Sequence, residues 1–204
     1  MEFWHETLTQ KSWDILLDLK KKPFHFILIG GWAAYLWTRL HKSKDVDIVL
    51  WDIKDVDYLK NNYVLKKNDN LKKYEISFEE IDVDIYVPYY SRLAIPPEDL
   101  KGLATKVEGI DVIIPEALLI LKQGAEEERE HSVKGDKDRI DIMALVFFTH
   151  IDFRRYDELL ARYSLQHYRK RLRHIIASFN DSQYLDMNLR EFTLKRKEVL
   201  KDFF

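Results

Sequence analysis

An apolar strand that ends in a glycine pair, followed by a helix and a second strand, is the feature that most constrains how this chain folds. The dense apolar run at residues 24–29 predicts a buried strand, and Gly30 and Gly31 end it. A helix is expected over residues 32–40 and an alternating strand over residues 45–51. This order of elements predicts a core built from both strands and helices.

Two aspartates share one face of the second predicted strand. Side chains along a strand point alternately to its two faces, so Asp45 and Asp47 point the same way. Paired carboxylates bind divalent cations, and Mg²⁺ is the expected choice, with Mn²⁺ as the alternative, because carboxylate and phosphate oxygens suit both ions. The plainer interpretation is a surface strand with two solvated aspartates.

A third carboxylate is expected from the strictly alternating strand at residues 81–87, which has one acidic face. Asp82 and Asp84 both lie on that face. Either one is a candidate to complete a metal site and to act as general base toward an acceptor hydroxyl. We expect this strand to lie beside the strand that carries Asp45 and Asp47.

The glycine pair has a separate role to play with phosphate. Without side chains, Gly30 and Gly31 let backbone N–H groups approach phosphate oxygens, and the following helix adds the positive end of its dipole. Ser43 and Lys44, just before the aspartates, are candidates for further phosphate contacts. Together these features indicate a nucleoside triphosphate (NTP) ligand, although a glycine pair before a helix is also an ordinary turn.

The chain has 204 residues, enough for one domain of ordinary size with a helical appendage. Residues 1–114 read as an amphipathic helix followed by alternating strands and helices, and residues 115–204 read as helical. We expect a mixed-sheet core over the first range, with the helical portion packed on it. Residues 91–102 are expected to form a loop, and the second helix of the later portion is expected to follow Gly135.

Composition excludes several classes of protein. The chain has no cysteine, so disulfides and thiolate metal sites are excluded. Its formal net charge of -2 does not indicate the strongly basic surface that is typical of nucleic-acid-binding domains. No run reaches the roughly 18 apolar residues of a membrane span, and the acidic side chains within residues 1–22 are not those of a signal peptide. We therefore expect a cytoplasmic protein without membrane contact.

The segments described so far resemble the nucleotidyltransferase superfamily, with its polymerase-beta-like fold. The family signature is a hydrophobic stretch, Gly-Gly or Gly-Ser, a short helix, Asp-x-Asp on the next strand and a third acid on a later strand. Residues 28–31, Asp45-Val46-Asp47 and Asp84 match it, and the apolar residues directly after Asp84 favour that aspartate over Asp82. The resemblance implies an α+β fold and a Mg²⁺-dependent enzyme that moves a nucleoside monophosphate from an NTP to a hydroxyl and releases pyrophosphate.

The Gly-Gly-Trp-Ala form of residues 30–33 is similar to the branch of that superfamily that holds the antibiotic nucleotidyltransferases and the AbiE-type toxin enzymes, and two later segments favour the toxin side. Residues 116–122 resemble the toxin family's Glu-x-Leu-hydrophobic-x-x-Lys helix, and residues 134–142 resemble its Arg-Gly-x-Lys-Asp-x-x-Asp segment, with lysine in place of the arginine. The resemblance implies that Lys122 lies near phosphate and that Asp141 is a polar partner in the site. An exposed helix lysine and ion pairing on a helix surface would explain the same residues.

The sequence leaves several classes of acceptor as alternatives. The toxin-like resemblance implies an RNA end, such as that of tRNA, or a protein, together with an antitoxin partner or a homodimer; the antibiotic branch implies a small-molecule hydroxyl. A basic segment with interleaved tyrosines at residues 154–173 could bind a polyanion, or it could be the outer face of packed helices. A non-catalytic nucleotide-binding module on the same fold, acting in a toxin–antitoxin interaction, is the third alternative.

Overall fold

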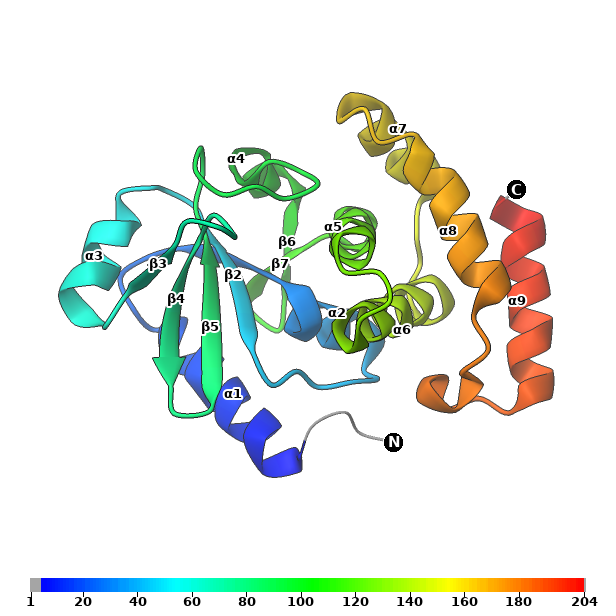
Figure 1. The fold of residues 1–204 in the computed structure, drawn as a ribbon, viewed down its shortest axis with the longest axis horizontal. Coiled ribbons are helices and arrows are strands. Elements are labelled where there is room, and N and C mark those ends of the chain that lie inside the picture. The colour runs from blue at the N-terminus through cyan, green and yellow to red at the C-terminus, as the bar shows by residue number, and fades with distance from the viewer. Residues whose placement is uncertain (1–4, 204) are drawn as a thin grey trace. The chain divides into compact units, whose positions relative to one another are not determined.

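The apolar and alternating segments before residue 115 form a sheet with helices, and the segments after it are helical (Figure 1). The computed structural model describes residues 5–203, with side chains for residues 5–201. Within these residues the chain divides into an N-terminal unit, residues 5–114, and a C-terminal unit, residues 115–203. The α+β fold class predicted from the sequence is confirmed.

The N-terminal unit is built on a mixed sheet. The strands are β1 Phe26–Ile29, β2 Val46–Leu50, β3 Lys66–Asn68, β4 Lys73–Phe78, β5 Ile81–Tyr86, β6 Ala104–Val107 and β7 Ile110–Ile113. Among the described residues they form one seven-stranded sheet in the order β3-β4-β5-β2-β1-β7-β6. β5 runs parallel to β2 and β7 runs parallel to β1, while the other neighbouring pairs are antiparallel. The expected pairing of the two acidic strands is therefore confirmed.

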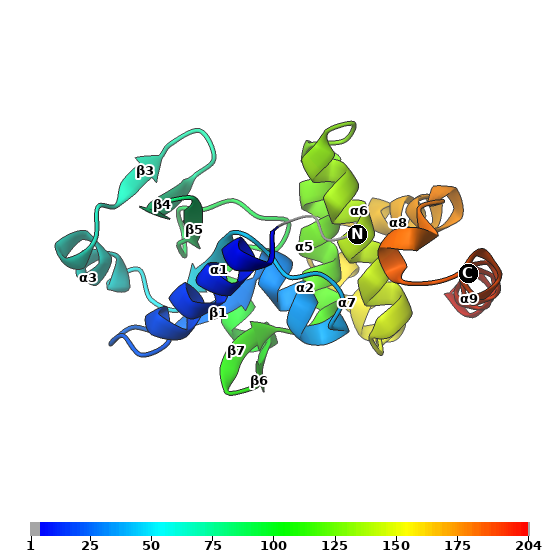
Figure 2. The same cartoon turned by 90° about the horizontal axis from the view of Figure 1, so that it is seen from below.

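The helices of this unit are α1 Glu6–Leu19, α2 Gly30–Thr38, α3 Asp55–Asn62 and α4 Pro97–Leu100. Figure 2 shows α1 alongside β1, and α3 lies at the β3 edge of the sheet. α1 is amphipathic and buries Leu16 and Leu19, which explains why it forms against the sheet. A short α4 with a 3-10 turn at Lys101–Leu103 replaces part of the loop expected at residues 91–102; Pro97 at the first turn of α4 allows this because proline's fixed φ suits a helix start.

Alternation along β2 and β5 separates an apolar face from an acidic one. Val46 and Ile48 of β2 are fully buried and lie opposite Val83 and Ile85 of β5. The residues between them point to the other face of the sheet. A one-residue slip of either strand would place carboxylates in the apolar core, so burial of these valines and isoleucines fixes the register.

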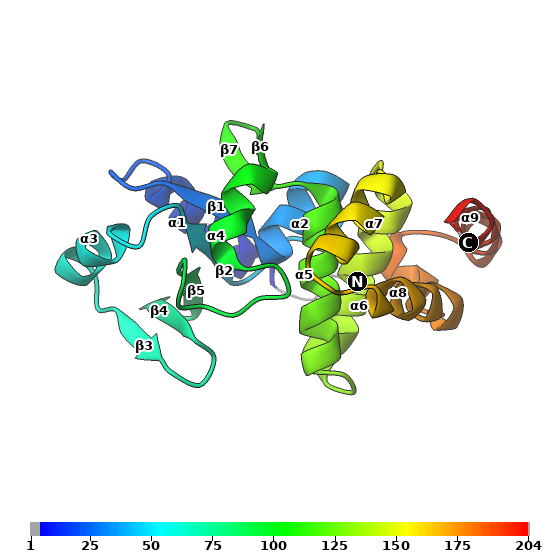
Figure 3. The same cartoon turned by 90° about the horizontal axis from the view of Figure 1, so that it is seen from above.

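The C-terminal unit consists of α5 Pro115–Glu128, α6 Val133–Phe148, α7 Phe153–Arg162, α8 His167–Ser178 and α9 Leu189–Phe203, with a 3-10 turn at Ser182–Leu185. Figure 3 shows α5 beside α6. α6 begins two residues before Gly135, contrary to the expectation, because the Ser132 hydroxyl accepts a hydrogen bond from the Gly135 N–H and caps the helix. None of the described helices combines the length and apolar character needed to cross a membrane.

A buried hydrogen bond joins α1 to α2. The indole Nε1–H of Trp32 donates to the Ser12 hydroxyl at 2.8 Å, and both residues are buried almost completely. The Trp13 ring packs 4.9 Å from the Trp32 ring, centroid to centroid. α2 carries Gly30 at its start, so this contact helps to fix the helix that follows the glycine pair.

We expect Ser12→Ala to lower the free energy of unfolding by about 1–3 kcal/mol, because the buried indole N–H loses its acceptor. Urea unfolding measures this loss. Ser77→Ala is the matched control, since it removes an exposed hydroxyl that bonds to Asp82, and we expect a change within about 0.5 kcal/mol. Equal losses in the two variants would contradict a special role for the α1–α2 bond.

Candidate active site

Asp47 and Asp84 lie side by side on the acidic face of the sheet. They are direct partners in the parallel register of β2 and β5, so both side chains leave the sheet at the same level. The Asp84 side chain is only 20% exposed. Burial, together with the negative charge of Asp47, raises the pKa of Asp84 to about 6, although the nearby Lys73 ammonium opposes the shift. Two partly buried carboxylates therefore lie side by side, and the Lys73 ammonium does not cancel the upward shift in the pKa of Asp84.

Gly30 lies directly against the Asp47 carboxylate. Its φ of +66° is in the left-handed region, and a Cβ built on it would come within 2.0 Å of Asp47 Oδ2. α2 begins at Gly30, so the carboxylate sits at the positive end of that helix. Only glycine combines this backbone conformation with this close approach. Gly31, the next residue, is buried within the first turn of α2.

Lys73 and Glu75 of β4 belong to the same cluster, and the sequence interpretation missed them. The Lys73 ammonium is 2.6 Å from Asp84 Oδ2 and 3.1 Å from Glu75 Oε1. The amide of Asn68 donates to the same Glu75 oxygen at 3.0 Å. Burial lowers the pKa of Lys73, but the ion pairs with Asp84 and Glu75 outweigh it, so the net shift is upward.

A sequence signal for these two residues does exist. The β4–β5 hairpin turns at residues 79–80, which pairs Phe78 with Ile81. Counting back from that turn places Glu75 opposite Asp84, with Lys73 on the same face one step further along β4. The strand boundaries expected from the sequence are close enough for this count.

Asp45 and Asp82 occupy different positions from Asp47 and Asp84. Asp45 precedes β2 instead of lying on it, and its carboxylate accepts a hydrogen bond from the backbone N–H of Asp82 at 3.3 Å. The Asp82 side chain is exposed and accepts from the Ser77 hydroxyl at 2.9 Å. The structure thus brings Asp84, and not Asp82, into contact with Lys73 of β4.

Ser43 and Lys44 lie in the segment between α2 and β2. Ser43 is buried and Lys44 is half-buried, directly before Asp45 in the chain. Phosphate binding by either residue stays a prediction.

Lys122 and Asp141 come together in the C-terminal unit. The Lys122 ammonium lies 2.6 Å from Asp141 Oδ2 and 3.3 Å from Asp138 Oδ1, and Asp138 also pairs with Arg129. Both aspartates and the lysine are buried. The alternative of an exposed lysine and surface ion pairs is therefore wrong, because α5 and α6 enclose these charges. The predicted phosphate role of Lys122 stays a prediction.

The carboxylate pair fits a divalent cation. Mg²⁺ is usually bound through one or two carboxylates, with substrate phosphates and water as the other ligands. Asp47 and Asp84 supply such a pair, and the missing side chain of Gly30 leaves room for the Asp47 carboxylate at the start of α2. Within the described residues, no group of three or more His, Asp or Glu side chains is arranged to hold a metal ion. The fit therefore rests on the pair together with a phosphorylated ligand.

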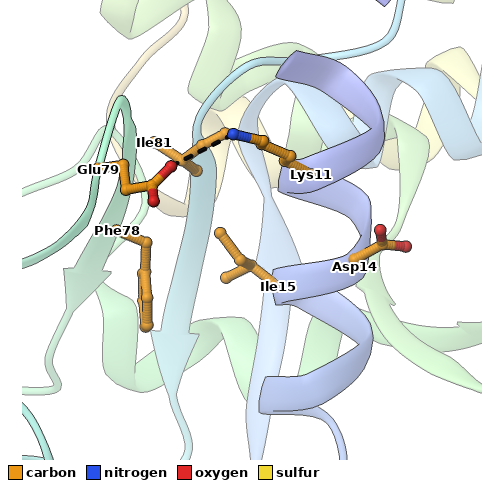
Figure 4. A pocket seen from close by; sticks show the side chains of 6 residues that line it. All are labelled: Lys11, Asp14, Ile15, Phe78, Glu79 and Ile81. Carbon is orange, nitrogen blue, oxygen red and sulfur yellow. Dashed lines mark hydrogen bonds and ion pairs between the residues drawn. The ribbon is translucent and has the colours of Figure 1, made fainter. Parts of the chain in front are cut away.

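A separate cavity of about 470 Å³ lies between α1 and the β4–β5 hairpin (Figure 4). Its lining comprises Lys11, Asp14, Ile15, Phe78, Glu79 and Ile81, and the Lys11–Glu79 ion pair of 3.2 Å crosses it. Ile81 belongs to the apolar face of β5, whereas Asp84 belongs to the acidic face. This cavity is therefore distinct from the candidate active site.

We expect Gly30→Ala to lower the free energy of unfolding by more than about 2 kcal/mol, because alanine disfavours a positive φ and its Cβ would collide with Asp47. Gly102→Ala is the control, since a Cβ there meets no atom within 4 Å, and we expect a change within about 0.5 kcal/mol. Chemical denaturation compares the two. A Gly30→Ala protein as stable as Gly102→Ala would refute the close packing of Gly30 on Asp47.

We expect Asp84→Asn to stabilise the metal-free protein by about 2–3 kcal/mol near pH 7. The folded carboxyl has a pKa of about 6 against an ordinary 3.8, so wild type loses stability as pH rises through that interval, and asparagine does not. The gain should vanish toward pH 4. Urea unfolding of wild type and Asp84→Asn across this pH range measures the gain. A pH-independent gain would count against a raised pKa at Asp84.

Comparison with known proteins places the fold. No protein-family model matches the chain, and no curated protein matches it in sequence. A candidate nucleotidyltransferase from H. pylori aligns with a TM-score of 0.53 at 17% identity, covering 98% of this chain and 96% of that one. JHP933 from Helicobacter pylori aligns with a TM-score of 0.51 at 16% identity, covering 98% and 92%. The chain therefore shares the fold of nucleotidyltransferase-like proteins.

Proposed function

We propose that the protein is a nucleotidyltransferase that moves a nucleoside monophosphate from an NTP to a hydroxyl acceptor. The observation that carries the proposal is the pairing of Asp47 with Asp84 across β2 and β5, directly at the start of α2. A metal–triphosphate ligand has an anionic and a cationic part. The helix N-terminus suits the phosphates, and the two carboxylates suit the cation. The fold shared with nucleotidyltransferase-like structures agrees with this assignment.

The site residues divide into those that would bind the metal ion and those that would bind the phosphates. Asp47 and Asp84 would hold Mg²⁺, or Mn²⁺ in its place, and Asp45, directly before β2, stays the predicted third metal ligand. A bound ion of this kind neutralises charge on the triphosphate and on the attacking and leaving oxygens. The backbone at Gly30 and Gly31 orients the phosphates.

The transfer itself is a substitution at phosphorus. The acceptor oxygen forms a bond to the α-phosphorus, and the bond from that phosphorus to the pyrophosphate oxygen breaks. Asp84 takes the proton of the acceptor hydroxyl as general base. One NTP and one acceptor hydroxyl are thus converted to a phosphodiester, which joins the nucleoside to the acceptor, and to pyrophosphate.

The acceptor we propose is an RNA end, such as that of tRNA, or a protein, with a small-molecule hydroxyl as the alternative. The basic residues on α7 and α8 give only weak support for an RNA acceptor, because several of them pair with acidic residues of the same unit. Arg169 pairs with Asp157, and Arg171 pairs with the buried Glu126. Tyr156 and Tyr168 are buried, so neither can stack on a base. Packing explains much of this segment, as one of the sequence interpretations predicts.

The first test removes the carboxylates. We expect Asp45→Asn with Asp47→Asn, and separately Asp84→Asn, to lower metal-dependent pyrophosphate release by about a hundredfold or more while the folded state persists. Pyrophosphate release from each NTP, with circular dichroism as the check on folding, measures this. Asp82→Asn is the matched control and should retain activity. Unchanged turnover in the double variant would refute the assignment, and loss only in Asp82→Asn would move the third acid to that position.

The second test identifies the acceptor. Incubation with each labelled NTP, Mg²⁺ and either total RNA or total protein should label one of these pools. Labelling of neither pool, with transfer to a small aminoglycoside, would favour the antibiotic-type alternative. NTP binding that ignores Mg²⁺ and yields no pyrophosphate would favour the non-catalytic module.

A further inference from the structure

Three carboxylates and one ammonium lie in a row across three neighbouring strands. Glu75 of β4 is the register partner of Asp84 of β5, which is the register partner of Asp47 of β2. Figure 1 shows β4, β5 and β2 as neighbouring strands. The three side chains therefore share one face. Lys73, two residues before Glu75, reaches the same face and contacts Asp84 at 2.6 Å and Glu75 at 3.1 Å. Its side chain is 11% exposed, so the ammonium is largely withdrawn from water.

This lysine occupies an oxygen that a metal ion would use. The Lys73 ammonium lies within hydrogen-bonding distance of Asp84 Oδ2. A divalent cation on the Asp47–Asp84 pair would lie within a few ångströms of that ammonium, and like charges at such a separation in a partly buried site repel strongly. Without a nucleotide Lys73 stays in the cluster, because it lies on β4 and has a second contact with Glu75. Glu75 is itself held by the Asn68 amide.

We propose that Lys73 acts as an internal counter-ion that makes divalent-cation binding at Asp47 and Asp84 depend on the nucleotide. The inference rests on the proposed function and concerns the order in which the site is filled. Without a nucleotide, Lys73 neutralises Asp84 and opposes a bare cation. A triphosphate adds negative charge beside the cluster, which offers Lys73 another anionic partner and relieves the opposition. Lys73 is thus a positioning residue, and Glu75 retains it.

Metal binding without turnover tests the proposal. Mn²⁺ affinity is measured by electron paramagnetic resonance, alone and with each of the four α,β-methylene ribonucleoside triphosphates. In wild type we expect weak binding of Mn²⁺ alone and tightening of about tenfold or more by at least one analogue. Lys73→Met should bind Mn²⁺ alone about tenfold more tightly, and the tightening by the analogue should shrink accordingly.

Three further variants separate this role from a structural one. Lys67→Met removes the same charge from the neighbouring strand β3. Lys67 pairs with Asp69, so this variant should bind Mn²⁺ as wild type does. Lys73→Arg keeps the charge and should keep the dependence on nucleotide. Lys73→Gln retains hydrogen-bond donors toward Asp84 and Glu75 without the charge, and it replaces Lys73→Met if that variant does not fold. A lysine that only stabilises β4 against β5 would lower the melting temperature and leave both Mn²⁺ affinities unchanged.

The outcomes distinguish the two proposals. If wild type binds Mn²⁺ and an analogue together but Lys73→Met and Lys73→Gln bind Mn²⁺ alone no more tightly than wild type, the role of Lys73 is refuted and the proposed function stands. If wild type binds no analogue even with Mn²⁺ present, the proposed function fails and this inference fails with it. Tighter binding of Mn²⁺ alone in the charge-removing variants, together with unchanged Lys67→Met, supports the inference.

Discussion

Backbone hydrogen bonds between the parallel strands β2 and β5 hold Asp47 and Asp84 side by side, and the candidate site depends on that pairing. The apolar residues that alternate with the two aspartates are fully buried, so neither strand can shift to relieve the repulsion between the carboxylates. The favourable free energy of burying these apolar residues thereby holds two like charges together. This enforced pairing of like charges supports the proposed cation site.

Positive groups near Asp47 and Asp84 reduce the electrostatic repulsion between the two carboxylates but do not remove it. The start of α2 places the positive end of a helix beside Asp47, and Lys73 places an ammonium against Asp84. The pKa of Asp84 still lies at about 6, which indicates that burial and the charge of Asp47 outweigh this help. A site balanced in this way can respond to added charge, whether from a metal ion, a triphosphate or a proton.

The sequence predicted the elements of this site better than its contacts. The apolar run before Gly30, the alternating strands and the preference for Asp84 over Asp82 follow from period-two patterning and family resemblance. Lys73 and Glu75 were missed because they become neighbours of Asp84 only through the register of the β4–β5 hairpin. Asp45 was expected on β2, yet it precedes the strand and accepts a backbone N–H at the start of β5, a contact between segments far apart in sequence.

Local patterning determined the mixed sheet, the glycine turn and the helices after residue 115, because hydrophobic periodicity and glycine act over a few residues. The tertiary structure alone decided which charges meet. It buried Lys122 with Asp138 and Asp141, enclosed Tyr156 in the core where a nucleic-acid contact had been considered, and set Lys73 against Asp84. The physical reason is that the partner and solvent exposure of a charged or aromatic side chain depend on elements distant in sequence, which no local pattern records.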